Sequence, residues 1–207
     1  MESKKLKIFA ILEHVVDIKT GELHGYRVLS RLVSKEEEIS FEDIPSKETK
    51  ANAEKSVLNA VCRREPDKPL FINMPFSLSI EDLPIYGVNL VVCIPISLSL
   101  VQISKTMSLL KGLGLKVALD DFTTVGYQLK ELRLGSFDYV FVDDEFYTNA
   151  GSKEIQRVVA FLKGFGSKVC FKRIDSTKKL EIALQAGADL GHGYFFGSET
   201  FQVGVLE

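Results

Sequence analysis

Ten residues stand at the ends of apolar runs of strand length, where side chains able to do chemistry are expected to gather. They are Arg27, Leu29, Arg31, Asn73, Cys93, Asp120, Asp121, Asp143, Lys172 and His192. The carboxylates and the carboxamide among them are oxygen ligands that suit divalent metals, and two metals about 3.5–4 Å apart can activate water against a phosphodiester. The arginines and the lysine would instead suit a bound anion.

The elements that must position these residues alternate between strands and helices. A tight turn at Lys19–Glu22 joins the first two strands, which predicts an antiparallel hairpin, and the later alternation predicts right-handed crossovers and parallel strands. The predicted strands are Lys7–Val16, Leu23–Leu32, Pro69–Asn73, Leu90–Ile94, Leu115–Leu119, Tyr139–Val142, Lys168–Phe171 and Leu190–Phe195. The predicted helices are Thr49–Arg64, Ser99–Gly112, Tyr127–Leu134, Ser152–Phe165 and Ser176–Ala186.

Eight strands with intervening helices predict an α/β fold, a modified (β/α)8 TIM-like barrel with an antiparallel first strand. In such a barrel the C-terminal strand ends meet at one mouth, where sites are built. The chain is short for a barrel, so some connections must be trimmed, and Val33–Lys47 and Ser77–Gly87 are the expected places. The acidic run Glu36–Glu38 is interpreted as a solvated loop.

Composition limits the classes of protein that this chain can be. Its 207 residues predict a single domain, 1–207, and a formal net charge of −2 gives no basic surface for a nucleic-acid polymer. Cys62, Cys93 and Cys170 lack metal-ligand spacing and are predicted to be buried thiols. No apolar run is long enough to cross a membrane and no signal peptide is evident, so a cytoplasmic location is expected.

Four segments together resemble one bacterial family. They read DIKTGELHGYRVLSRL at Asp17–Leu32, LGLKVALDDFTTVGYQLKEL at Leu113–Leu132, FDYVFVDDEF at Phe137–Phe146 and GADLGHGYFFG at Gly187–Gly197. Their order and spacing resemble the EAL family, whose members hydrolyse cyclic di-GMP on this type of barrel. The resemblance implies a place for this chain in cyclic di-GMP signalling.

The resemblance also implies that the reaction has been lost. The glutamate that names the family, a metal ligand, falls on Arg27, and two further glutamates fall on Cys93 and Lys172. At these three positions the formal charge changes from −3 to +2. The family's lysine beside the attacking water falls on Phe141. We therefore expect no metal, no other cofactor and no catalytic residue. Arg27 and Lys172 can fill the vacated metal positions and pair with Asp120, Asp121 and Asp143, an interpretation favoured over the alternative that the two cations are selected for a ligand.

Other positions keep what the family uses around its nucleotide. Leu29 and Arg31 keep a Leu-x-Arg pattern, Asn73, Asp120, Asp121 and Asp143 match the family's residues, and His192 replaces a glutamine. With Arg27 and Lys172 they form the predicted ligand site for cyclic di-GMP. For Arg31 a salt bridge to a neighbouring strand-end carboxylate remains an equal alternative, and for His192 a hydrogen bond within the mouth is favoured over ligand contact.

Two departures weigh against nucleotide binding and family-style dimerisation. Glu13 and His14 replace a glutamine and a proline. The family's glycine-threonine-glycine loop reads Thr123–Tyr127, with β-branched residues where glycines would allow positive φ. The oligomeric state is therefore left open.

Three functions remain at the level of sequence. The favoured one is a noncatalytic EAL-like regulatory protein that binds a protein partner, with the helix Thr49–Arg64 and the tail Phe201–Leu206 as candidate surfaces. We expect the apolar tail to pack on the barrel bottom rather than on a partner. The alternatives are a metal-independent cyclic di-GMP receptor and, less favoured, an active phosphodiesterase.

Overall fold

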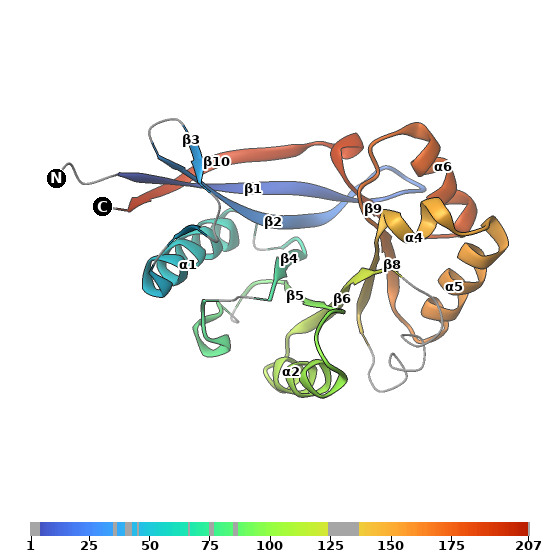
Figure 1. Ribbon diagram of the computed structural model, residues 1–207, viewed down its shortest axis with the longest axis horizontal. Helices are drawn as coiled ribbons and strands as arrows, with labels where there is room; N and C mark the ends of the chain where they lie inside the picture. The colour runs from blue at the N-terminus through green and yellow to red at the C-terminus, as the bar shows by residue number, and fades with distance from the viewer. Residues whose placement is uncertain are drawn as a thin grey trace.

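Eight strands close into a barrel in a computed structural model that describes residues 5–34, 37–39, 43–44, 46–65, 67–74, 77–84, 87–123 and 137–206 (Figure 1). The barrel strands are β1 (Leu6–Asp17), β2 (Leu23–Ser34), β4 (Leu70–Asn73), β5 (Leu90–Pro95), β6 (Lys116–Phe122), β7 (Tyr139–Val142), β8 (Lys168–Phe171) and β9 (Leu190–His192). β2 and β4 to β9 are parallel neighbours in chain order, and β1 closes the ring by pairing antiparallel with β2 and β9. The predicted fold, with its antiparallel first strand, is confirmed.

The turn between β1 and β2 forms as the sequence predicts. The Asp17 carboxylate accepts from the backbone N–H groups of Lys19 and Thr20, and Gly21 takes a positive φ of 75°. Glycine takes this conformation at little cost, so the turn closes without strain.

Two more strands extend the hairpin beyond the barrel mouth. β3 (Glu37–Ile39) pairs with the end of β2, and β10 (Ser198–Leu206) pairs antiparallel with β1, with Leu206 opposite Leu6 (Figure 1). Because β1 runs against the barrel, its start lies beside the C-terminal end of β2. The prediction that the tail packs on the barrel bottom is therefore wrong: β10 lies on the mouth side, where Phe201 packs under the Arg64 guanidinium at 4.6 Å.

Helices cover the outside of the barrel in the described parts of the chain. They are α1 (Lys47–Arg64), α2 (Leu100–Gly112), α4 (Asp144–Asn149), α5 (Ser152–Gly164) and α6 (Thr177–Ala186), with the 3-10 turns η2 (Ile80–Asp82) and η4 (Tyr194–Phe196). Ser46 caps α1, and Ser99 with Gln102 forms a capping box on α2, as serine does at helix starts. None of these helices is long and apolar enough to cross a membrane.

Several predicted segments either lie outside the described residues or have a secondary structure other than the predicted one. The helix Tyr127–Leu134 and residues 124–127 of the loop after Asp121 lie outside the described residues. In their described residues, Val33–Lys47 and Ser77–Gly87 hold β3 and η2 instead of a full connecting helix. Glu37 and Glu38 form β3 rather than the predicted loop, because the extended hairpin offers β2 as a pairing partner, whereas Glu36 is not among the described residues.

The barrel interior is filled, so the site must lie at its mouth. The interior layer contains Val15, Phe71, Val91, Cys93, Ala118, Tyr139, Phe141, Cys170 and Leu190, all buried. A second, larger apolar layer separates the strands from the helices. All three cysteines are free and buried, which confirms their prediction as buried thiols.

Candidate functional site

Five predicted site residues meet at the mouth in one network of ion pairs and hydrogen bonds, which we call the mouth cluster. They are Arg27, Asn73, Asp120, Asp121 and Lys172. Nη2 of Arg27 donates to Oδ2 of Asp120 at 2.5 Å and to Oδ1 of Asn73 at 2.7 Å. Nζ of Lys172 donates to Oδ1 of Asp120 at 2.9 Å and to Oδ1 of Asp121. Both cations are thus engaged by residues of the protein.

Strand geometry brings the mouth cluster together from four parts of the chain. Arg27 lies in β2, Asn73 ends β4, Asp120 lies near the end of β6, and Lys172 directly follows β8. Parallel strand ends converge on one rim, so residues far apart in sequence become neighbours. Asp121 has a φ of 59°, a left-handed conformation that aspartate tolerates better than most residues, and its N–H donates to Oδ1 of Asp120 at 2.9 Å.

Burial makes these charges strongly dependent on one another. Arg27, Asp120 and Lys172 are each buried, and the Arg27 guanidinium also lies 5.3 Å from the centre of the Phe141 ring. Burial alone would raise the pKa of Asp120, but Arg27 and Lys172 outweigh it and lower that pKa from 3.8 to about 2. The Asp120 carboxylate therefore stays ionised at neutral pH.

The residues of the mouth do not fit a pair of divalent metals. Arg27, Cys93 and Lys172 stand where the resemblance implies metal-binding glutamates, and burial raises the pKa of the Cys93 thiol to about 12. A neutral thiol is a poor ligand for a hard cation, and Asp120 and Asp121 already accept bonds from cations. In the part of the chain that the structure describes, no group of three or more His, Cys, Asp or Glu residues is arranged to hold a metal ion.

Asp143 takes other partners than the ones predicted. Its carboxylate caps α4, accepting from the Glu145 N–H at 3.1 Å, and lies 3.6 Å from Nη1 of Arg173. The prediction that Asp143 would pair with Arg27 and Lys172 is thus not met. The physical reason is α4, a short helix that the sequence pattern did not reveal and whose first N–H groups need an acceptor.

His192 forms a buried pair with Glu13, a residue that sequence reasoning regarded only as a departure from the family. Nε2 of His192 and Oε2 of Glu13 lie 2.5 Å apart. Burial lowers the pKa of His192, while the hydrogen bond from His192 lowers the pKa of Glu13. The pair is therefore a neutral imidazole that donates to an ionised carboxylate. This is the hydrogen bond within the mouth that the sequence favoured for His192.

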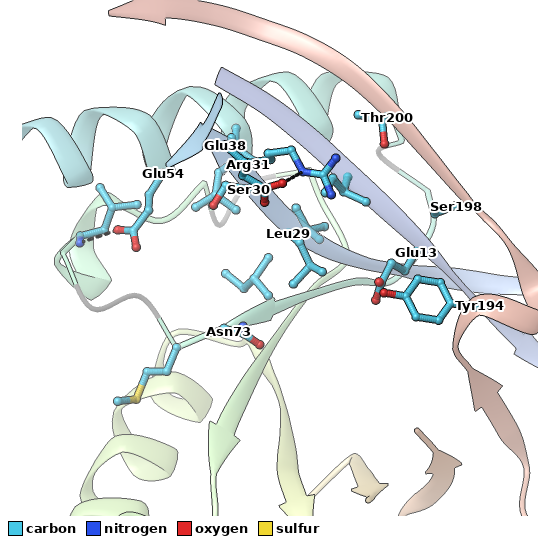
Figure 2. Close-up of a pocket in the computed structure, with 17 residues that line it drawn as sticks. Glu13, Leu29, Ser30, Arg31, Glu38, Glu54, Asn73, Tyr194, Ser198 and Thr200 are labelled. Atoms are coloured by element: carbon cyan, nitrogen blue, oxygen red, sulfur yellow. Dashed lines mark hydrogen bonds and ion pairs between the residues drawn. The ribbon is translucent and has the colours of Figure 1, made fainter. Parts of the chain in front are cut away.

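A cleft of about 610 Å³ opens beside the mouth cluster, under the projecting hairpin (Figure 2). We use "the cleft" for the space lined by Ile11, Glu13, Val28, Leu29, Ser30, Arg31, Glu38, Glu54, Val57, Leu58, Ile72, Asn73, Met74, Leu78, Tyr194, Ser198 and Thr200. Three predicted ligand residues, Leu29, Arg31 and Asn73, thus face one open space. Arg31 is half-exposed there and pairs with Glu38 through Nε at 3.2 Å, which is the kind of carboxylate partner foreseen as its alternative role.

Three solved structures with similar folds were determined with c-di-GMP. One is the MucR phosphodiesterase in complex with c-di-GMP, with a TM-score of 0.75 and 14% identity over 95% of this chain and 92% of that one. Another is the Bacillus subtilis YkuI protein with substrate c-di-GMP and calcium, with a TM-score of 0.75 and 17% identity over 97% of this chain and 57% of that one. A third is the Xanthomonas citri FimX EAL domain with c-di-GMP, with a TM-score of 0.71 and 15% identity over 93% and 88% of the two chains. At these identities the likeness concerns the fold.

Sequence comparison gives the family. A relative from Azorhizobium caulinodans, an uncharacterised protein, is 34% identical over 98 residues, which are 45% of this chain and 13% of that protein. This match covers a small part of a much longer protein and carries no function. Residues 7–199 match the sequence model described as the EAL domain, which is most of the 207-residue chain. The chain therefore belongs to the EAL domain family.

Proposed function

We propose that this protein is a noncatalytic EAL domain of cyclic di-GMP signalling that acts by binding another protein. The mouth cluster is the observation that supports the absence of catalysis. Arg27 and Lys172 occupy it as fixed cations, and each is bound to Asp120.

Loss of catalysis follows from the electrostatics of the mouth. Hydrolysis of a phosphodiester by two metals needs free carboxylates that can neutralise two divalent ions. Here Arg27 and Lys172 place two positive charges among the remaining acidic residues, and both cations are buried. A metal ion would have to displace a buried ammonium or guanidinium from Asp120, so that the buried cation would lose its Asp120 partner, which is unfavourable.

Binding of a protein is favoured over binding of a nucleotide by the charge of the cleft. Its described lining carries three carboxylates, from Glu13, Glu38 and Glu54, and one guanidinium, from Arg31. An anionic dinucleotide would bring two phosphates into this acidic surface. A protein partner can bind at the face of the barrel that holds the mouth if that face is accessible, and the cleft makes it accessible.

Metal-independent binding of cyclic di-GMP is the second candidate. It is favoured by Leu29, Arg31 and Asn73, which match family residues facing the nucleotide and which line the same cleft. The solved relatives MucR, YkuI and FimX bind this nucleotide. In this case Arg31 would leave Glu38 and pair with a phosphate or a guanine edge.

Chromatography of the reaction products tests the catalytic half of the proposal. The purified chain is incubated with cyclic di-GMP and either Mg2+ or Mn2+, with the MucR phosphodiesterase as a positive control. We expect no linear product above the protein-free blank. Product that forms in proportion to the protein and disappears in Asp120→Asn would overturn the proposal.

Titration calorimetry with cyclic di-GMP, with and without Mg2+, separates the two candidates. The proposal predicts no binding heat in either condition. Micromolar binding that is indifferent to Mg2+ and is lost in Arg31→Ala would replace it by the receptor function. Gln202→Ala is a matched control, since Gln202 is an exposed residue of β10.

A further inference from the structure

We propose that the cleft is a docking site for a segment of a partner protein in which lysine or arginine stands beside large apolar side chains. This inference rests on the proposed function, a protein-binding EAL domain, and names the chemistry of the partner. It is carried by the shape, the apolar floor and the acidic rim of one cleft.

The floor of the cleft is apolar and is built from rigid elements. Val28 and Leu29 of β2, Ile72 of β4, and Val57 and Leu58 of α1 line it. Four of these side chains belong to the apolar core, so the floor is held in place by the packing beneath it, and Leu29 is half-buried. A volume of about 610 Å³ can accept several side chains of a bound segment.

Carboxylates surround this floor on several sides. Figure 2 shows Glu54 and Glu13 on opposite sides of Leu29, with Glu38 of β3 beside Arg31 of β2. The half-buried Glu54 carboxylate accepts from the Leu78 N–H at 3.2 Å, and burial raises its pKa. A half-buried carboxylate gains from a cationic partner that compensates for its lost hydration. The rim therefore favours lysine or arginine in the occupant.

Tyr194 adds an aromatic surface at the same rim. It lies in η4 with 88% of its surface exposed, next to Glu13 in the cleft wall (Figure 2). Gly193, which precedes it, has a φ of 146° that sets the course of the chain into η4. An exposed tyrosine ring beside the Glu13 carboxylate suits an arginine, which can stack on the ring while it pairs with that acid.

The cleft offers fewer binding partners to an anionic ligand than to a basic one. Arg31 is the one cation among the described lining residues, and it is paired with Glu38. Asn73 accepts from Arg27 through its side-chain oxygen, and Arg27 and Lys172 are buried in bonds to Asp120. Formally, three carboxylates and one guanidinium give the described lining a charge of −2, which repels phosphates and attracts a basic segment.

Selection from a phage-displayed library of random peptides on the immobilised full chain tests the proposal. We expect enriched sequences that combine Lys or Arg with Leu, Ile, Met, Phe or Tyr. Each selected peptide is then synthesised and its Kd is measured by fluorescence anisotropy. Glu54→Gln and Glu38→Gln are isosteric and neutral, and together they should weaken binding about tenfold or more. Glu181→Gln, at an exposed position of α6, is the matched control and should leave the Kd unchanged.

The remaining outcomes overturn the inference in distinguishable ways. Enrichment of acidic or uncharged sequences, or no enrichment over a blocked surface, would show that the cleft does not select basic apolar segments. Basic peptides whose Kd ignores Glu54→Gln and Glu38→Gln would leave a protein-binding domain but place its site elsewhere. Circular dichroism of each variant shows that it is folded. The hydrolysis assay above decides separately whether the domain is catalytic.

Discussion

Arg27 and Lys172 neutralise carboxylates at the mouth that would otherwise repel one another. Asp120 receives bonds from both cations, and Asp121 receives one from Lys172. A permanent cation attached to the chain needs no ion from solution, but it cannot polarise water. At the scale of single residues, the mouth is therefore held together by ion pairs within the chain.

Two arginines of β2 should differ sharply in their contribution to stability. Arg27 is buried against Asp120, whereas Arg31 is half-exposed and pairs with the exposed Glu38. Arg27→Ala leaves Asp120 with Lys172 as its one buried cation, so we expect a loss of about 3 kcal/mol in the free energy of unfolding. Arg31→Ala should cost less than about 1 kcal/mol. Urea denaturation at neutral pH measures both, and equal costs would contradict this account of the mouth.

Asp120 should also make stability depend on pH in a defined range. Its pKa is about 2 in the folded protein and 3.8 ordinarily, so its stabilisation is complete above pH 3.8 and is lost as the pH falls toward 2. The difference corresponds to about 2 kcal/mol. Asp120→Asn should be less stable than the unmodified protein at neutral pH, and this deficit should shrink by about that amount between pH 4 and pH 2.

Denaturation at a series of pH values measures the deficit directly. Glu154→Gln, at an exposed position of α5, serves as the control and should track the unmodified protein throughout. A deficit that stays constant down to pH 2 would mean that Asp120 does not hold its charge through Arg27 and Lys172.

At the scale of elements, the sequence predicts the parts that follow regular patterns. The boundaries of β7 and β8 agree with the predicted Tyr139–Val142 and Lys168–Phe171, because both are short runs of mostly apolar residues with clear ends. The hairpin follows from its turn residues. The convergence of Arg27, Asn73, Asp120, Asp121 and Lys172 follows from the fold once strand ends are aligned.

Elements that depend on tertiary partners were not predictable in this way. α4 is a six-residue helix, too short to show helical periodicity in the sequence. The role of Asp143 as its N-cap could therefore not be predicted. β3 and β10 form because the long hairpin offers free edges for pairing. The bond between Glu13 and His192 joins residues 179 positions apart, and no local pattern indicates it. The cleft exists for the same reason, since the hairpin, α1 and η4 meet only in three dimensions.

The link from β9 to η4 depends on one glycine. A Cβ at Gly193 would lie 2.5 Å from both N and O of Ile174, and its φ of 146° is unfavourable for any side chain. We expect Gly193→Ala to lower the free energy of unfolding by about 3 kcal/mol or more and to shift Tyr194. Gly112→Ala, where a Cβ meets nothing within 4 Å, should be neutral or slightly stabilising. Thermal denaturation compares the two, and equal effects would contradict the proposed constraint.

At the scale of the whole molecule, the mouth cluster and the cleft are adjoining regions with different burial and charge. The mouth cluster is a buried, internally neutralised part of the barrel, while the cleft beside it is open, apolar at its floor and acidic at its rim. Asn73 belongs to both regions, since it accepts from Arg27 and lines the cleft. This EAL domain thus combines a mouth that is neutralised by internal ion pairs with an open cleft beside it.

Calorimetric titration of the unmodified protein with Mn2+ at neutral pH tests whether the ion pairs of the mouth cluster exclude a metal ion. Since Arg27 and Lys172 already neutralise Asp120 and Asp121, the account predicts no saturable heat. The double variant Arg27→Glu, Lys172→Glu, if folded by circular dichroism, should bind Mn2+ and gain thermal stability from it. Stoichiometric binding of Mn2+ by the unmodified protein, abolished in Asp120→Asn, would contradict the account, because it would show that the mouth still holds a metal.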